Sequence, residues 1–276
     1  EAQGKDAAAL NEYEAAVRKA PDSAVALGSL IELEVKLEGA DKAGQRLKAL
    51  IQENPEHGSA HRLLGSVYMA QRDYVSAEQE FQRQIEIDPK VAGSYAQLAQ
   101  ARAAQKNLDG AAEAYNSGLN VLPDTPQLLI GLAGVLERQQ DYDAAISKYE
   151  QVLEQQPDNA ISINNLAALL SDHRTDAASL DKAAELAEKL EKTSQPAFLD
   201  TAGWVYYRKG DYDKALPILK RVVDEAPQVP VFQYHLGMTY FQKGDKAAAK
   251  EHLTLATAGD YSYQGIEEAR ATLESL

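Results

Sequence analysis

Hydrophobic positions along the chain recur in groups spaced three and four residues apart, with polar residues between the groups. This spacing is typical of amphipathic helices. Short polar turns such as 72–74, 140–142 and 244–245 separate consecutive groups, and an Asp or Gly in such a turn ends one helix and caps the next. No segment shows the alternation of a β-strand, so we predict an all-α chain.

The helical pattern itself repeats. Prolines recur every 34 residues, at Pro21, Pro55, Pro89, Pro123 and Pro157. The strongest marker, which we call the register alanines, recurs in seven consecutive units at Ala43, Ala77, Ala111, Ala145, Ala183, Ala215 and Ala249. A small residue precedes it in most units, at Gly65, Ala99, Ala133, Ala167, Gly203 and Gly237. Because one helix pair cannot bury its apolar face alone, neighbouring pairs must stack into a solenoid.

The repeats predict one solenoid over residues 1–276. A partial unit at 6–23 precedes full units at 24–57, 58–91, 92–125, 126–159, 160–195, 196–229 and 230–263, and 264–276 forms a capping helix. The unit 160–195 is two residues longer than its neighbours. We place the extra residues in a long inter-helix loop, 171–179, followed by a shortened second helix.

The spacing of these positions resembles the tetratricopeptide repeat (TPR). The resemblance is carried by Leu64, Gly65, Tyr68, Ala77, Phe81 and Pro89, and again by Leu236, Gly237, Tyr240, Ala249 and Leu253. It implies a right-handed TPR superhelix, an α-solenoid of about seven helix-turn-helix units with a partial N-terminal unit and a C-terminal capping helix. It also implies a non-catalytic protein–protein interaction scaffold whose first helices line a concave groove for a protein or peptide segment.

In that arrangement the groove of the last three units holds most of the aromatic side chains, which, with arginine, dominate binding hot spots. The partner-binding residues expected there are Asn164, Asn165, Asp200, Thr201, Trp204, Tyr207, Arg208, Tyr234, His235, Met238 and Phe241. The alternative for Trp204 is packing between units or beneath the capping helix. Earlier units place Arg62, Ser66, Met69, Gln97 and Gln100 in the groove, a composition that predicts no hot spot.

Charge and composition exclude several classes of function. With 28 Lys+Arg against 42 Asp+Glu the net charge is −14, which disfavours binding to nucleic acid or to an anionic membrane. The chain has no cysteine, so disulfides and thiolate metal sites are excluded. The longest apolar run, 128–136, is too short to span a bilayer, so we expect no membrane insertion by this segment.

Catalytic and metal chemistry find little support. His57 and His61 are four residues apart, but Pro55 interrupts the helix that would align them as metal ligands. His173 has no nucleophile beside it in a motif, and no Gly-rich phosphate loop occurs. We therefore expect no enzyme activity, no metal and no cofactor.

The residues at the relevant positions reject one more specific hypothesis, that the chain binds a C-terminal carboxylate as co-chaperone TPR domains do. Co-chaperone TPR domains hold a C-terminal carboxylate with Lys and Asn on one helix, Asn on the next, and Lys and Arg on a third. The matching positions here are Ile130, Gly134, Asn165, Ala197 and Thr201, so one of five agrees. We do not expect binding to a chaperone tail.

A closer resemblance suggests a setting. The stretches 164–167, 179–183, 199–207 and 234–237 look like the C-terminal part of bacterial TPR lipoproteins that accompany exosortase-type surface-protein sorting and exopolysaccharide production. This implies a cell-envelope, periplasmic location and a lipid-anchored parent chain, with a cytoplasmic TPR adaptor as the alternative. Because the sequence starts at Glu1 without Met, we expect a processed or excised piece. A further alternative is a scaffold that self-assembles as a homo-oligomer, because the array begins in mid-unit.

Overall fold

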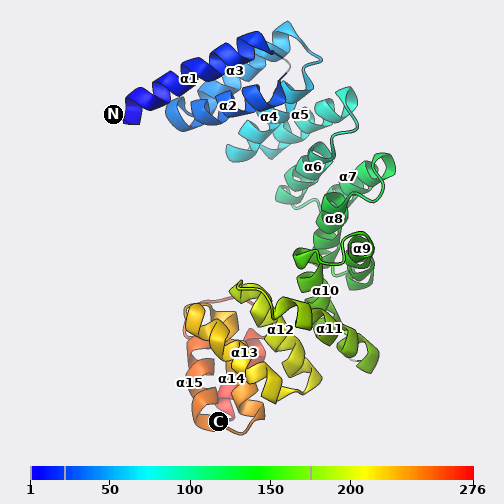
Figure 1. Ribbon diagram of the computed structural model, residues 1–276, viewed down its shortest axis with the longest axis vertical. Coiled ribbons are helices and arrows are strands. Elements are labelled where there is room, and N and C mark those ends of the chain that lie inside the picture. The colour runs from blue at the N-terminus through cyan, green and yellow to red at the C-terminus, as the bar shows by residue number, and fades with distance from the viewer. Residues whose placement is uncertain (1, 22, 175) are drawn as a thin grey trace. The chain divides into compact units, whose positions relative to one another are not determined.

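The computed structural model describes residues 2–21, 23–174 and 176–276. Every regular element in those ranges is an α-helix, so the predicted all-α fold is confirmed (Figure 1). The chain divides into two compact units, Glu1–Asp141 and Tyr142–Leu276. Within the described ranges, no helix combines the length and the apolar character that crossing a membrane requires.

The first unit contains two layers of helices. Its elements are α1 (Ala2–Lys19), α2 (Ala24–Glu38), α3 (Ala40–Glu53), α4 (Gly58–Ala70), α5 (Tyr74–Ile87), α6 (Ala92–Ala104), α7 (Leu108–Val121) and α8 (Pro126–Arg138). The helices α2, α4, α6 and α8 contact one another in order and form an inner layer, whereas α3, α5 and α7 each pack between two of them. The helix α1 packs on α2, where the second helix of a preceding repeat would lie.

The second unit repeats this arrangement. Its elements are α9 (Tyr142–Gln155), α10 (Ala160–His173), α11 (Ala177–Leu190), α12 (Pro196–Lys209), α13 (Tyr212–Glu225), α14 (Pro230–Gln242), α15 (Lys246–Thr257) and α16 (Ile266–Glu274). The inner layer consists of α10, α12, α14 and α16. The helix α16 packs on both α14 and α15, so it occupies the place of the first helix of a further repeat.

Small residues allow the helices of each pair to approach closely. All seven register alanines are 0% exposed. A Cβ added to Gly65 would lie 2.5 Å from the ring of Phe81, and one added to Gly203 would lie 2.6 Å from Leu219. At these two glycines, and at Gly237 beneath Leu253, the small residue of a first helix therefore lies under a large residue of the second helix, as the repeat pattern predicts.

The turns inside the repeats follow from local chemistry. A side-chain oxygen caps the second helix by accepting a backbone N–H three residues on, at Asp73, Asn107, Asp176, Asp211 and Asp245. The residue before most of these caps has a positive φ, which favours glycine. Gly210 and Gly244 supply it in the second unit, with φ of 84° and 81°, whereas Arg72 and Lys106 take φ of 62° and 64° in the first.

The extra length of the unit 160–195 lies elsewhere than predicted. The helix α10 continues to His173 and α11 begins at Ala177, so the segment 171–179 is largely helical and no long loop forms. The helix α11 has 14 residues, the same as α9 and α13, and is not shortened. Ala183 lies in the second turn of α11, whereas Ala145 lies in the first turn of α9. Relative to its register alanine, α11 therefore both begins and ends earlier than α9. Thr175 lies outside the described residues.

The register alanines give a test of the packing. Leucine in place of Ala249, which is 0% exposed, should overpack the contact between α14 and α15 and lower the free energy of unfolding by about 1–3 kcal/mol. The control is Ala247→Leu, an exposed position on the same helix, which should be nearly neutral. Urea denaturation followed by circular dichroism measures both, and equal stabilities would contradict the alignment of repeats.

The strained turn gives a second test. Arg72→Gly should raise the free energy of unfolding by several tenths of a kcal/mol to about 1 kcal/mol, because glycine adopts the positive φ without a steric cost. Its counterpart Gly244→Arg should destabilise by a similar amount. A loss of stability in Arg72→Gly, measured in the same denaturation experiment, would show that the side chain has a role the backbone does not explain.

Candidate partner-binding site

The sequence-predicted site residues all lie on inner-layer helices of the second unit. Asn164 and Asn165 belong to α10, five residues from Asp200 to Arg208 belong to α12, and Tyr234, His235, Met238 and Phe241 belong to α14. The structure brings six of them to one cavity of about 310 Å³, which we call the C-terminal pocket: Asp200, Thr201, Trp204, Arg208, Tyr234 and His235. Asp172, Gln264, Gly265 and Glu268, which the sequence did not indicate, complete much of the lining.

Trp204 is largely committed to the packing of the second unit. It is 7% exposed and shares a hydrophobic cluster with Tyr234, Met238 and Ala269 of α16. Its indole N–H donates to Asp172 Oδ1 at 2.9 Å. These contacts correspond to the alternative predicted for this residue, packing beneath the capping helix, and leave little of the ring open to a partner.

The rings around Trp204 form a stack. The centroid of the indole lies 4.0 Å from that of His235 and 4.4 Å from that of Tyr207, with interplanar angles of 20° and 10°. Such stacking restrains the rings against one another. The aromatic side chains that the sequence offered as a hot spot therefore hold α12 and α14 together.

The buried polar groups of the C-terminal pocket satisfy one another. His235 Nδ1 lies 2.9 Å from both carboxylate oxygens of Asp200. Burial raises the pKa of the Asp200 carboxyl, and the nearby His235 opposes that shift. The Tyr234 hydroxyl donates to Glu268 Oε2 at 2.6 Å, and burial, followed by this carboxylate, raises the pKa of Tyr234. These buried groups keep little hydrogen-bonding capacity for a ligand, whereas Arg208, half-buried at the same pocket, forms no ion pair or side-chain hydrogen bond within the described residues.

The remaining predicted residues do not line this pocket. Asn165 donates from Nδ2 to the Tyr149 hydroxyl at 2.8 Å, and Asn164 donates from Nδ2 to Asn165 Oδ1 at 3.0 Å. Phe241 is half-buried near the end of α14. The sequence thus placed these residues on the correct helices but grouped too many of them into one site.

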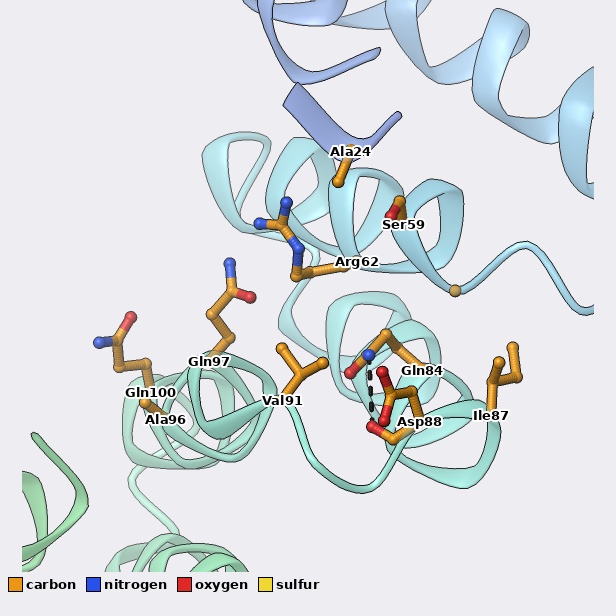
Figure 2. Close-up of a pocket in the computed structure, with 12 residues that line it drawn as sticks. Ala24, Ser59, Arg62, Gln84, Ile87, Asp88, Val91, Ala96, Gln97 and Gln100 are labelled. Atoms are coloured by element: carbon orange, nitrogen blue, oxygen red, sulfur yellow. Dashed lines mark hydrogen bonds between the residues drawn. The ribbon is translucent and has the colours of Figure 1, made fainter. Parts of the chain in front are cut away.

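A larger cavity, of about 720 Å³, opens on the inner layer of the first unit (Figure 2). We call it the α4–α6 pocket. Its lining comes from α2, α4, α5, α6 and the link between the last two, and consists of Ala24, Gly58, Ser59, Arg62, Gln84, Ile87, Asp88, Val91, Gly93, Ala96, Gln97 and Gln100. Small side chains on α6 and at the start of α4 keep the cavity open to a chain that approaches closely.

Two buried acceptors in the α4–α6 pocket have no donor. Gln84 is 3% exposed; its Nε2 donates to the Asp88 carbonyl at 3.5 Å, and its Oε1 has no hydrogen-bond partner among the described residues. Figure 2 shows that this amide oxygen faces Val91 and the cavity. Gln97 donates from Nε2 to Ser66 Oγ at 2.9 Å, and its Oε1 is likewise buried without a partner among those residues.

The α4–α6 pocket also contains a half-buried cation without a charged partner in the described residues. Within the described part of the chain, Arg62 forms no ion pair and its guanidinium makes no hydrogen bond. Arg46 and Arg102 of the same unit pair with glutamates, at 3.0 Å to Glu34 and 2.8 Å to Glu78. The side chain of Arg62 extends along the cavity beside Gln97 (Figure 2).

The sequence analysis placed Arg62, Gln97 and Gln100 in the groove but did not predict a binding site there, because this set contains no aromatic residue of the kind that dominates hot spots. It missed Gln84, which comes from the end of a second helix. What distinguishes Gln84 and Gln97 is that each keeps a buried amide oxygen without a partner among the described residues, a property of the packing that has no signal in the sequence. Gln100 is exposed.

The two candidate metal-ligating histidines have structural contacts. His57 Nδ1 accepts the Ala60 backbone N–H at 3.3 Å and so caps α4. His61 lies with Nδ1 2.6 Å from Glu80 Oε2 and with Nε2 3.0 Å from the Pro55 carbonyl oxygen. In the ranges that the structure describes, no three acidic or imidazole side chains converge in a way that could hold a metal ion.

Solved structures share the fold at low sequence identity. A tetratricopeptide repeat protein from Parabacteroides merdae superposes with a TM-score of 0.64 and 16% identity, covering 96% of this chain and 99% of that one. A chain of the APC/C hetero-tetramer Cut9–Hcn1 superposes with a TM-score of 0.66 and 15% identity, and the match covers 98% of this chain but 52% of that one. PilF of Pseudomonas aeruginosa superposes with a TM-score of 0.62 and 18% identity, and the match covers 78% of this chain and 97% of that one. At these identities the likeness shows the fold alone.

Family models agree with the repeats seen in the structure. No curated protein matches the sequence. One model of the tetratricopeptide repeat matches residues 37–103 and 206–266, and a second matches 95–160 and 138–196. Together these matches cover most of the chain, and they include the helices that line the α4–α6 pocket. The chain therefore belongs to the tetratricopeptide repeat family.

Proposed function

We propose that this chain is a non-catalytic scaffold that holds an extended segment of a protein partner in the α4–α6 pocket. TPR proteins bind protein partners, and the Cut9–Hcn1 neighbour is itself part of a hetero-tetramer. The observation that carries the proposal is the pair of buried acceptors without a donor among the described residues, the Oε1 atoms of Gln84 and Gln97. Beside them lies the half-buried guanidinium of Arg62, which has no ion-pair partner in those residues.

The unsatisfied groups favour a peptide backbone as the ligand. A buried acceptor without a donor costs about 1–3 kcal/mol, which an N–H from a ligand would recover. An extended segment presents N–H and C=O groups along both edges, and glutamine amides pair with both. A helical segment has already used those groups within its own turns, so it fits less well.

The C-terminal pocket forms a second, weaker part of the proposal. Thr201 and Arg208 line it and are half-buried, so they remain open to a partner, whereas Asp200, His235 and Tyr234 are already hydrogen-bonded within the chain. Asn164, Asn165, Tyr207 and Phe241 are half-buried on the same inner layer, and Met238 is buried. Their proposed role is to add contact area for the partner, whereas the α4–α6 pocket anchors the bound segment.

The proposed setting is the bacterial cell envelope, in a surface-protein-sorting or exopolysaccharide assembly with a lipid-anchored parent chain. It is supported by the resemblance of four sequence stretches to bacterial TPR lipoproteins of those systems: 164–167, 179–183, 199–207 and 234–237. Fractionation of the native source tests it: the proposal expects the protein in the envelope fractions, and recovery with cytoplasmic markers would favour the adaptor alternative. Light scattering over a concentration series separates a monomeric scaffold from a self-assembling one.

Filling the pocket tests the binding proposal. A Cβ on Gly93 would meet no atom within 4 Å, so Gly93→Trp should fit the fold while its ring occupies the α4–α6 pocket. The control is Val75→Trp on α5, a 58% exposed residue outside the pocket. Peptides selected from a displayed random library on the unmodified protein should lose binding to Gly93→Trp and keep binding to Val75→Trp. Equal binding to both variants would contradict the assignment of the site.

The role of Trp204 gives a separate test. Trp204→Ala should lower the free energy of unfolding by about 3–5 kcal/mol, because the indole packs in the cluster under α16. The control Arg208→Ala removes a half-buried residue of the same pocket and should change stability by about 0.5 kcal/mol or less. If Trp204→Ala kept full stability and removed partner binding instead, the indole would be part of an open binding surface.

A further inference from the structure

We infer that the segment held in the α4–α6 pocket presents an internal acidic side chain, Asp or Glu, to Arg62. This inference rests on the proposed function and names the chemistry of the segment. It identifies Arg62 as the specificity-determining contact, whereas Gln84, Gln97 and Gln100 contact backbone that every sequence shares.

The first argument is the unpaired charge of Arg62. The chain carries 42 acidic residues against 28 basic ones, so a basic side chain has many carboxylates available. Arg102 on the neighbouring helix α6 contacts both Glu78 and Glu113. Arg62 contacts none of the carboxylates in the described residues, although it is half-buried in a cavity. A partly desolvated guanidinium binds a carboxylate more strongly than it binds any neutral group.

The second argument concerns the acid that lines the same pocket. Asp88 is exposed and accepts the Lys90 backbone N–H at 3.0 Å through Oδ1, so it stabilises the turn after α5. In Figure 2 Asp88 lies on the Gln84 side of the cavity, away from Arg62. Among the described residues no carboxylate pairs with Arg62, so an acidic side chain of the partner would supply the missing counter-charge.

The third argument decides between an internal acid and a chain end. Figure 2 places Gln97 and Gln100 on one side of Arg62 and Gln84 on the other. A segment that continues past Arg62 in both directions can reach all three amides, whereas a chain that ends there would leave one side unmet. An internal acid and a chain end present the same carboxylate to Arg62, so the positions of the three amides decide between them.

The apolar lining is consistent with this segment. Ile87, Val91 and Ala96 are half-buried and line the cavity beside the polar groups. They suit small or medium apolar residues next to the acid. No aromatic side chain lines the cavity, so the geometry does not select a large aromatic anchor.

The test is a selection followed by measured affinities. A displayed library of random twelve-residue peptides is selected in parallel on the unmodified protein, on Arg62→Ala, on Arg62→Glu and on Arg72→Gly. Arg72 is the matched control, since it is an exposed arginine on the turn after α4 and does not line the pocket. The unmodified protein and Arg72→Gly should select peptides with a fixed Asp or Glu, and Arg62→Glu should select Lys or Arg at that position.

Synthetic versions of the strongest peptide then isolate the contact. Replacing its acid by the matching amide should weaken binding about ten- to a hundredfold to the unmodified protein and much less to Arg62→Ala. Arg62→Lys should recover part of the affinity, because it keeps the charge but loses the bidentate geometry. Amidating the C-terminus of the peptide should have no effect. Circular dichroism of each variant checks that it is folded.

Three outcomes would overturn the inference, and they are distinguishable. If peptides bind and Gly93→Trp blocks them, but the acid-to-amide change has no effect, then the pocket binds a segment without selecting an acid. If C-terminal amidation abolishes binding, the carboxylate is a chain end. If the unmodified protein selects no peptide at all, the proposed function fails together with this inference.

Discussion

The close approach of two helices at a small residue is the interaction on which this structure depends. A glycine or alanine on the first helix lies under a large residue of the second, as Gly65 lies under Phe81, and the register alanines are fully buried. A longer side chain at these positions would separate the pair and expose apolar surface that only the next repeat can cover. The stacking of repeats, and with it the inner layer of first helices, follows from this constraint.

The inner layer determines where polar groups can remain unsatisfied. The outer helices have solvent on one side, so their charged residues pair on the surface or bind water. On the inner layer the side chains of adjacent repeats face one another, and a polar atom is either paired across the layer or left buried. In the second unit Trp204, Asp200 and Tyr234 are paired with the chain itself. In the second unit Asn164 Oδ1 is also buried without a partner among the described residues, but it does not line the C-terminal pocket. In the first unit Gln84 and Gln97 keep free acceptors that line one cavity, so this unit has the stronger case for a ligand.

The sequence was a good guide to the fold and a partial guide to the site. Helices, repeat frame and buried alanines follow from spacing alone, because each is a local or nearest-neighbour property. The insertion in 160–195 was misplaced, since extra residues can be taken up in the first turns of a helix as readily as in a loop. The burial of Trp204 depends on α16, more than fifty residues later, and the free acceptor of Gln84 depends on how two repeats meet. Neither property is visible in the composition of a helix face.

The most direct measurement is a nuclear magnetic resonance titration of the folded chain with a selected peptide, which follows the side-chain amides of glutamine and the Nε–H of arginine. Binding at the α4–α6 pocket predicts saturable shifts for Gln84, Gln97 and Arg62, with small changes at Trp204. Saturable shifts centred on Trp204 and its neighbours, with Gln84 and Arg62 unmoved, would contradict the account.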